Sequence, residues 1–184
     1  MSKFIKLSKD IRERLIDITN HVGGHLASNL GVVEITLALH TIFDSPRDKF
    51  LWDTSHQTYV HKMLTGRLND MYTIKQYKGL SGFSKISESD HDIFGAGHAS
   101  TSLSAAVGLA QARNARKEDH SVVCVLGDGG LSGGMAYEAL NNIEQLKGNF
   151  ICILNDNDMS ISPPVGAMAK YITSIRTLKI YDDV

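Results

Sequence analysis

The sequence has little cysteine, no long apolar run and almost no net charge, and each shortage excludes a class of protein. Its apolar stretches are far shorter than the ~20 residues that a membrane-spanning helix needs. The N-terminal MSKFIKLSKD lacks the apolar core and small-residue cleavage site of a secretory signal. With 19 basic against 20 acidic residues, the net charge of −1 gives no electrostatic basis for binding nucleic acid or a membrane. We therefore expect a cytoplasmic protein with neither kind of partner.

The two cysteines, Cys124 and Cys152, lie inside apolar runs, so we expect both to be small buried side chains. A length of 184 residues is enough for one domain with a substantial core, and 42% hydrophobic content is ordinary for a globular protein. The expected organisation is one domain over residues 1–184.

Helix-like and strand-like periodicities alternate along most of the chain. Ser8 is a candidate N-cap for the first helix, and the glycines at positions 23 and 24 are expected to end that helix. Helices are predicted over residues 11–22, 32–43, 56–66, 100–116 and 132–146, and strands over 50–53, 122–126 and 150–155. Residues 67–97 lack periodicity and are expected to form a loop. The alternation predicts an α/β fold, a mostly parallel sheet with helices on both faces, containing a right-handed βαβ unit.

The stretch VVCVLGDGGLSGG, residues 122–134, runs from a predicted buried strand into a glycine-rich loop that contains Asp128. Asn157 follows the next predicted strand, within NDNDMS. Because ligands of parallel sheets collect beyond the carboxyl ends of the strands, we expect Asp128 and Asn157 to face one point. Their oxygens suit Mg²⁺, and the glycines and the helix N-terminus behind them would admit a phosphate. The pattern predicts a metal that anchors a diphosphate.

Each motif taken alone has a simpler explanation. Gly-Asp-Gly is usually a turn, and NDND is usually a solvated turn. The G-x-G-x-x-G spacing of a dinucleotide site is not met, and a carboxylate in the loop would repel a pyrophosphate unless a cation lay between them. The spacing of the two motifs across one βαβ unit is what favours the metal site.

With these motifs the sequence resembles the thiamine diphosphate enzymes, whose signature is GDG followed by an Asn after a helix and a strand. GGHLASNLGVV, FGAGHASTSLSAA, GDGGLSGGMAYEALNN and ILNDNDMSISPPVGA stand in the order and spacing of the N-terminal part of the 1-deoxy-D-xylulose-5-phosphate synthase family. The resemblance covers most of residues 8–168. It implies a thiamine diphosphate-binding fold with thiamine diphosphate and Mg²⁺ as cofactors.

The resemblance also implies a reaction and the residues that serve it. Pyruvate would lose CO₂, and its remaining two-carbon unit would join D-glyceraldehyde 3-phosphate to give 1-deoxy-D-xylulose 5-phosphate. The implied Mg²⁺ ligands are Asp128, Asn157 and the carbonyl of Met159; the cofactor-binding residues are His56, Gly97, His98, Ala99, Gly129, Gly130 and Asn157; the catalytic residues are His25, His56 and His98. A lone histidine is more often structural, so only the motifs favour catalytic roles for these three, for which a near-neutral pKa is suitable.

The chain departs from the family motifs in two places near these histidines. It reads DTSHQTYVHK where the family usually has DVGHQAYPHK, and GHASTS where the family has GHSSTS. Ser55 and Ala99 are therefore expected to affect the shape of the pocket or one hydrogen bond, and with it the preference for the acceptor.

The resemblance further implies parts that these 184 residues do not include. These are the rest of the sheet, the C-terminal domain, and the pyrimidine-binding domain with its glutamate, together with the arginines that hold the acceptor phosphate. We expect these domains as partners, on the same polypeptide or a second chain, and a homodimer of the complete enzyme. Two classes of function stay open: part of such an enzyme, with transketolase-type ketol transfer as the related alternative, or a non-catalytic cofactor-binding fragment.

Overall fold

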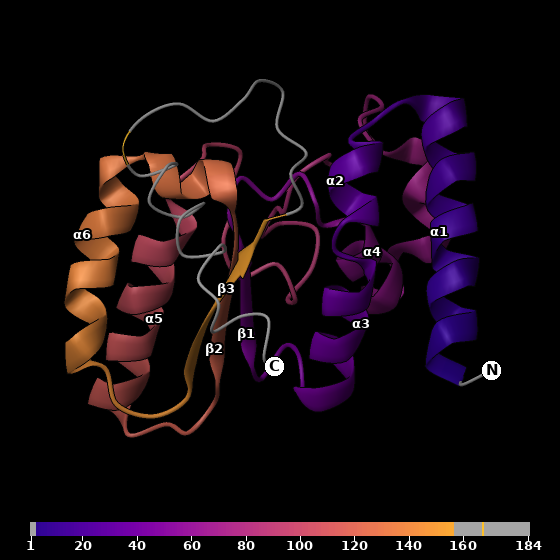
Figure 1. Ribbon diagram of the computed structural model, residues 1–184. Helices are drawn as coiled ribbons and strands as arrows, with labels where there is room; N and C mark the ends of the chain where they lie inside the picture. The colour runs from indigo at the N-terminus through magenta and orange to yellow at the C-terminus, as the bar shows by residue number, and fades with distance from the viewer. Residues whose placement is uncertain (1–2, 157–166, 168–184) are drawn as a thin grey trace, which may run out of the picture.

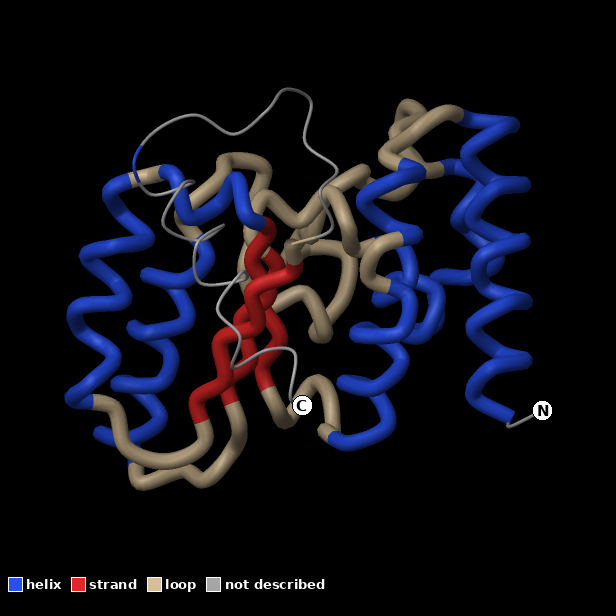
Figure 2. Tube along the Cα trace, in the orientation of Figure 1, coloured by secondary structure: helices blue, strands red, loops and turns tan. Residues whose placement is uncertain are grey.

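The computed structural model describes residues 3–156 and residue 167, and it arranges them as a parallel sheet between two groups of helices (Figure 1 and Figure 2). The principal helices are α1 (Lys3–Val22), α2 (Leu26–Leu30), α3 (Val33–Ile42), α4 (Tyr59–Lys62), α5 (Ser102–Arg116) and α6 (Gly134–Asn142). The strands are β1 (Lys49–Trp52), β2 (Val122–Gly127) and β3 (Phe150–Asn155). They lie in the order β1-β2-β3 with both pairings parallel, which confirms the predicted α/β fold.

The side chains of β2 alternate between two apolar cores, one on each face of the sheet. Val122, Cys124 and Leu126 pack with α5 and α6, whereas Val123 and Val125 pack with α3. All five are fully buried, as expected for the central strand of a parallel sheet. Helices therefore cover both faces, with α5 and α6 on one side and α1 to α4 on the other (Figure 1).

The long helix α1 packs against α3 and α4 through a third core that includes Leu15 and Ile18. It begins at Lys3, so the prediction that Ser8 caps it was wrong. Ser8 lies inside the helix, where its hydroxyl donates to Glu34, and Arg12 binds the same carboxylate at 2.6 Å. None of the described helices is both long and apolar enough to cross a membrane.

Several element boundaries differ from the sequence-based expectation. The helix expected over 56–66 begins only at Tyr59, and its helical backbone breaks at Thr65 and Gly66, where Gly66 has a φ of +89°. A 3-10 helix (Leu68–Thr73) follows this break. The start of the predicted loop is therefore helical. The helix expected over 132–146 is shorter, because 3-10 turns (Asp128–Ser132 and Ile143–Gln145) flank α6. The helix expected over 32–43 is confirmed as α3, and the short helix α2 before it was not predicted.

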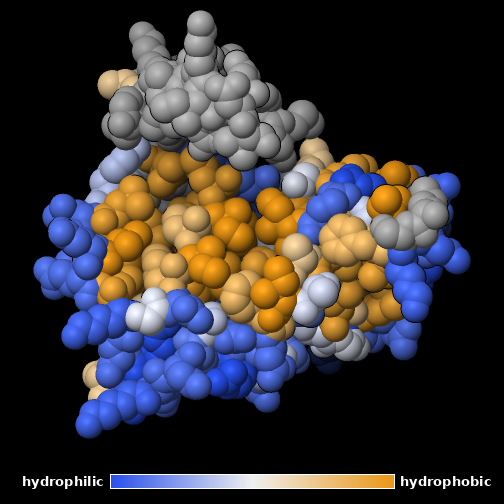
Figure 3. All heavy atoms as spheres, turned by 60° about the horizontal axis from the view of Figure 1, so that its bottom comes forward, coloured by the Kyte–Doolittle hydropathy of each residue, from blue (hydrophilic) through white to orange (hydrophobic). Residues whose placement is uncertain are grey.

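The strand β3 has one paired side and one open side among the described residues. Cys124 is buried as predicted, but its register partner Cys152 is exposed, so the prediction for Cys152 was wrong. The reason is that the described helices leave part of this strand uncovered, and Ile151 and Leu154 are also 36% and 42% exposed. Figure 3 shows hydrophobic residues gathered over a broad area of one face of the molecule.

Candidate functional site

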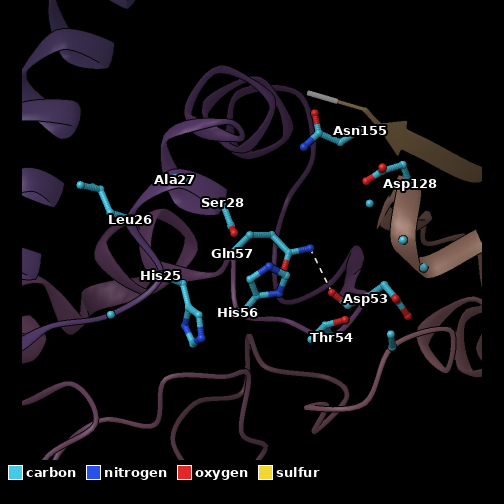
Figure 4. A pocket seen from close by; sticks show the side chains of 15 residues that line it. His25, Leu26, Ala27, Ser28, Asp53, Thr54, His56, Gln57, Asp128 and Asn155 are labelled. Atoms are coloured by element: carbon cyan, nitrogen blue, oxygen red, sulfur yellow. Dashed lines mark hydrogen bonds between the residues drawn. The ribbon is translucent and has the colours of Figure 1, made fainter. Parts of the chain in front are cut away.

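The carboxyl ends of all three strands border one cavity of about 610 Å³. Its sheet side is formed by residues that follow β1, β2 and β3, and its opposite wall by α2 and the segment before it (Figure 4). The lining residues are Gly24, His25, Leu26, Ala27, Ser28, Asp53, Thr54, His56, Gln57, Ala99, Gly127, Asp128, Gly129, Gly130 and Asn155. Crevices at this end of a parallel sheet are where ligands of such folds bind.

The Gly-Asp-Gly-Gly turn after β2 presents bare backbone and one carboxylate to this cavity. A Cβ added to Gly127 or Gly129 would meet no atom within 4 Å, so the chain here faces open space. Asp128 has no side-chain partner among the described residues, and none of the described residues that line the cavity is a lysine or arginine. An anionic ligand would therefore need a cation beside it, since the cavity itself supplies carboxylates.

Asp53 connects three segments around the cavity, and it was not predicted as a site residue. Its side chain is buried and accepts the backbone N–H of Ser100 at 2.8 Å and of Ser102 at 3.1 Å. A Cβ on Gly130 would lie 2.6 Å from its Oδ2, so only glycine fits there. Gln57 donates to the Asp53 carbonyl at 3.0 Å (Figure 4). Asp53 follows a strand directly, as Asp128 does. An aspartate at that position could have been predicted from the sequence to lie at the ligand end of the sheet.

Two of the predicted catalytic histidines, His25 and His56, lie side by side in the cavity wall. The ring centroids of His25 and His56 are 5.3 Å apart, in an edge-to-face arrangement. Burial lowers the pKa of His25, and Lys75 lowers it further. Burial also lowers the pKa of His56, with a contribution from His25. Both rings are therefore neutral near pH 7, each with one N–H donor and one acceptor nitrogen.

Asn29 of α2 fixes the backbones that carry these histidines, and it too was not predicted as a site residue. Its amide N–H groups donate to the carbonyls of His25 at 2.8 Å and His56 at 2.9 Å. Its side-chain oxygen accepts the N–H of Tyr59 at 2.8 Å. The side chain is fully buried, so these bonds replace water entirely. No periodicity marks such a residue, because its partners are distant in sequence.

The cavity brings together most of the predicted site residues but not all of them. Those that line it are His25, His56, Ala99, Asp128, Gly129 and Gly130. Gly97 and His98 are exposed and do not line it; His98 donates from Nδ1 to the Ala99 carbonyl at 2.8 Å. Asn157 and Met159 lie outside the described residues. Within residues 3–156 and 167, no three His, Cys, Asp or Glu side chains are grouped so as to hold a metal.

The two departures from the family motifs have different surroundings. Ser55 is buried with a φ of +65°, and its hydroxyl accepts the N–H of Ser84 at 2.9 Å. It ties a neighbouring loop and does not line the cavity. Ala99 does line the cavity. Of the two substitutions, only Ala99 therefore changes a side chain that borders the space for a ligand.

A buried group of charged residues, here called the Lys62 cluster, holds the loop after the 3-10 helix against α4. It consists of Lys62, Arg67, Glu88 and Asp92. Arg67 binds both oxygens of Asp92 at 2.8 and 2.9 Å, and Lys62 binds Glu88 at 2.5 Å. The loop held in this way supplies Phe83, whose ring centroid is 5.6 Å from that of His25.

A family model described as 1-deoxy-D-xylulose-5-phosphate synthase matches residues 1–184, the whole of the chain. The chain belongs to the 1-deoxy-D-xylulose-5-phosphate synthase family. It is 58% identical over 178 residues to the 1-deoxy-D-xylulose-5-phosphate synthase of Alkaliphilus oremlandii, covering 97% of this chain and 28% of that protein. It is 56% identical over 181 residues to that of Bacillus cytotoxicus, covering 98% and 29%. The chain thus spans less than a third of the length of these synthases and corresponds to their N-terminal portion.

Solved structures of transketolases share the fold of this synthase-family chain. The transketolase of Leishmania mexicana superposes with a TM-score of 0.78 at 22% identity, covering 94% of this chain and 31% of that one. The transketolase of Campylobacter jejuni gives a TM-score of 0.72 at 26% identity, covering 84% and 28%. The common architecture confirms the predicted fold class.

Proposed function

We propose that this chain forms the diphosphate- and Mg²⁺-binding part of an enzyme that condenses pyruvate with D-glyceraldehyde 3-phosphate, releasing CO₂ and giving 1-deoxy-D-xylulose 5-phosphate. The observation that carries the proposal is one cavity that joins the Gly-Asp-Gly-Gly turn to His25 and His56, in a chain that matches the synthase family over its whole length. The transketolase-type alternative is disfavoured, because identity is 56% to 58% with the synthases and 22% to 26% with the transketolases.

The described residues fit thiamine diphosphate and Mg²⁺ in their chemistry. Asp128 is a carboxylate without a described partner, beside glycines that leave open space for phosphate oxygens. Mg²⁺ is usually held by one or two protein oxygens together with substrate phosphates, which suits a cavity whose described lining has carboxylates and no lysine or arginine. Asp128 would hold the metal with Asn157 and the carbonyl of Met159, and the backbone of Gly129 and Gly130 would border the diphosphate.

The bound cofactor would supply the electron sink for decarboxylating pyruvate, and the chain's own residues would orient and protonate the reacting groups. Burial keeps His25 and His56 neutral, so each ring has one N–H donor and one acceptor nitrogen. Ala99 borders the same cavity. We propose that the preceding residues Gly97 and His98 contact the bound cofactor together with it.

The complete enzyme would need domains beyond this chain. We propose that the pyrimidine-binding and C-terminal domains are its partners and that the assembled enzyme is a cytoplasmic homodimer. The support is the 28% to 29% of the relatives' length that the chain covers, together with the side of β3 that no described strand pairs.

The metal role of Asp128 is tested by titrating thiamine diphosphate affinity across Mg²⁺ concentrations in the complete enzyme. Asp128→Asn should weaken binding because it keeps an oxygen but loses charge, and Asp128→Ala should weaken it more. Loss of residues that merely support metal ligands costs about 10- to 100-fold in affinity, so at least about tenfold is expected for Asp128→Ala. Raising Mg²⁺ should partly restore affinity, since metal and diphosphate binding are linked.

Two further variants serve as comparisons. Asn157→Ala should resemble Asp128→Ala in direction. Asn155→Ala, which alters a cavity residue with no proposed ligand role, should change the Mg²⁺ dependence less. If Asp128→Ala binds the cofactor with unchanged affinity and unchanged Mg²⁺ dependence, the carboxylate serves only the turn and the metal role is wrong.

A further inference from the structure

Tyr59 is a fully buried residue whose hydroxyl meets His25 twice. The hydroxyl oxygen lies 3.3 Å from the backbone nitrogen of His25 and 3.3 Å from its ring Nδ1. The backbone N–H can only donate, so it occupies a lone pair of the hydroxyl oxygen. The Tyr59 O–H group therefore still needs a hydrogen-bond acceptor of its own.

The ring Nδ1 of His25 is the acceptor available to that proton among the described residues. If Nδ1 carried its own proton instead, the hydroxyl would accept twice and its O–H would stay unpaired in a fully buried position. Leaving a buried donor unpaired is costly, so the arrangement with the hydroxyl donating to Nδ1 is preferred. Burial raises the pKa of Tyr59, which keeps the hydroxyl protonated and able to donate.

We propose that Tyr59 is a positioning residue that holds His25 in the tautomer with Nδ1 bare and Nε2 protonated. The ring then offers Nε2–H to the cavity that His25 lines, and it acts there as a hydrogen-bond donor. A donor at this place suits a carbonyl or hydroxyl oxygen of a bound substrate. This last step rests on the proposed function, whereas the tautomer itself does not.

The surroundings of His25 support a fixed ring as well as a fixed tautomer. His56, Phe83 and Tyr59 place ring centroids 5.3, 5.6 and 6.3 Å from that of His25. Asn29 fixes the backbone of Tyr59 and of His25 at once, so the hydroxyl and Nδ1 are carried by segments tied to each other. Histidine tautomers are commonly set in this way, by the hydrogen bond at the nitrogen that does not face the site.

The test is ¹⁵N NMR of the histidine rings in the complete enzyme at neutral pH, with Tyr59→Phe and the matched control Tyr72→Phe. In the unsubstituted protein, Nδ1 of His25 should have the shift of an unprotonated nitrogen and Nε2 that of an N–H. In Tyr59→Phe the tautomers should mix, since a hydrogen bond of typical net strength sets a population ratio of about fivefold. Tyr72→Phe removes a tyrosine hydroxyl that bonds Asp17 instead, and it should leave the His25 shifts unchanged.

Each outcome decides the proposal. A protonated Nδ1 in the unsubstituted protein overturns it, and this measurement needs no variant, so a Tyr59→Phe protein that fails to fold does not remove the test. Unchanged His25 shifts in a folded Tyr59→Phe protein also overturn it. Mixed tautomers with unchanged turnover would support Tyr59 as the positioning residue while contradicting the proposed role of His25 in the reaction, so the two failures are distinguishable.

Discussion

Gly24 illustrates how a single backbone position leaves room for a buried side chain. Its φ is +143°, and a Cβ at this position would lie 2.8 Å from the Tyr59 hydroxyl oxygen. The preceding Gly23 has a φ of +74°, but a Cβ there would meet nothing within 4 Å. The two glycines therefore share the need for an unusual backbone angle and differ in whether a side chain would fit.

Replacing these glycines with alanine separates backbone strain from steric exclusion. Gly23→Ala should cost about 1–2 kcal/mol of unfolding free energy, the usual penalty for a left-handed residue with a Cβ. Gly24→Ala should cost more and should also displace Tyr59, shifting the NMR signals of His25. Denaturant unfolding and NMR of both variants check this. Equal stability losses with unchanged His25 signals would contradict the close approach.

Sequence motifs found part of the site at this scale and missed the residues that support it. Asp128, Gly129 and Gly130 were predicted from the spacing of two motifs across one βαβ unit and from the family resemblance. Asn29 and Tyr59 were not, since their contribution depends on hydrogen bonds between segments far apart in the chain. Such contacts exist only in the folded protein, where burial makes each unpaired polar atom costly.

At the scale of structural elements, the loop after the 3-10 helix is held by the buried ion pairs of the Lys62 cluster. Asp92 is buried and binds Arg67 through both oxygens, and the backbone N–H of Lys85 donates to it at 2.9 Å. Removing one partner of a buried ion pair leaves an uncompensated charge, which costs far more than losing an exposed pair. Compensation of buried charge is thus one of the interactions that hold the loop.

Two arginine–aspartate pairs, one buried and one exposed, allow this difference in cost to be measured. Arg67→Ala should destabilise the protein by about 3–5 kcal/mol, because Asp92 would stay buried without its main partner. Arg47→Ala removes an arginine–aspartate contact of 2.7 Å whose side chains are 56% and 88% exposed, and it should change the unfolding free energy far less, because solvent screens an exposed pair. Denaturant unfolding measures both. A small loss for Arg67→Ala would mean that the loop is held by other contacts.

A histidine pair next to the same cluster predicts acid sensitivity. Burial, and then His61 and His91, lower the pKa of His40 from 6.5 to about 4, and its Nε2 lies 2.9 Å from Nδ1 of His61. The unfolded chain therefore takes up a proton below pH 6.5 that the folded state accepts only near pH 4. The stabilisation is full above pH 6.5 and is lost as pH falls to about 4, by up to about 3 kcal/mol.

The variant His40→Gln removes this titration while keeping a polar side chain opposite His61. Its unfolding free energy should fall less steeply between pH 6.5 and 4 than that of the unsubstituted protein, although His61, whose pKa burial also lowers, leaves some slope. Unfolding curves over that range measure the difference. Identical slopes would exclude His40 as a source of the acid sensitivity.

The strands and the βαβ unit could be predicted because apolar periodicity and length specify them directly. The region after Gly66 could not, since its 3-10 helix and loop are fixed by ion pairs and by a glycine with positive φ, which leave no periodic pattern. The exposure of Cys152 also escaped prediction. An apolar strand sequence does not reveal whether neighbouring elements cover it.

The whole molecule covers only the N-terminal 28% to 29% of its synthase relatives, and this limits the activity expected of the isolated chain. The isolated 184-residue chain should not decarboxylate pyruvate, even with thiamine diphosphate and Mg²⁺, because the proposed pyrimidine-binding partner would be missing. Release of CO₂ from rigorously pure chain measures this, with the complete enzyme as the positive control. Steady turnover by the chain alone would contradict the proposed division of the active site.

The open side of β3 has a consequence for how occupancy of the cavity could be detected. The strand is bonded on one side only among the described residues, yet its last residue, Asn155, borders the cavity. Local opening of such an edge is cheap, and a ligand that binds only the closed form opposes it. Backbone amides of β3 should therefore exchange with deuterium more slowly once thiamine diphosphate and Mg²⁺ are added, while those of the central strand β2 change less. The exchange rates of the β3 amides would then report whether a ligand occupies the cavity at the carboxyl ends of the strands.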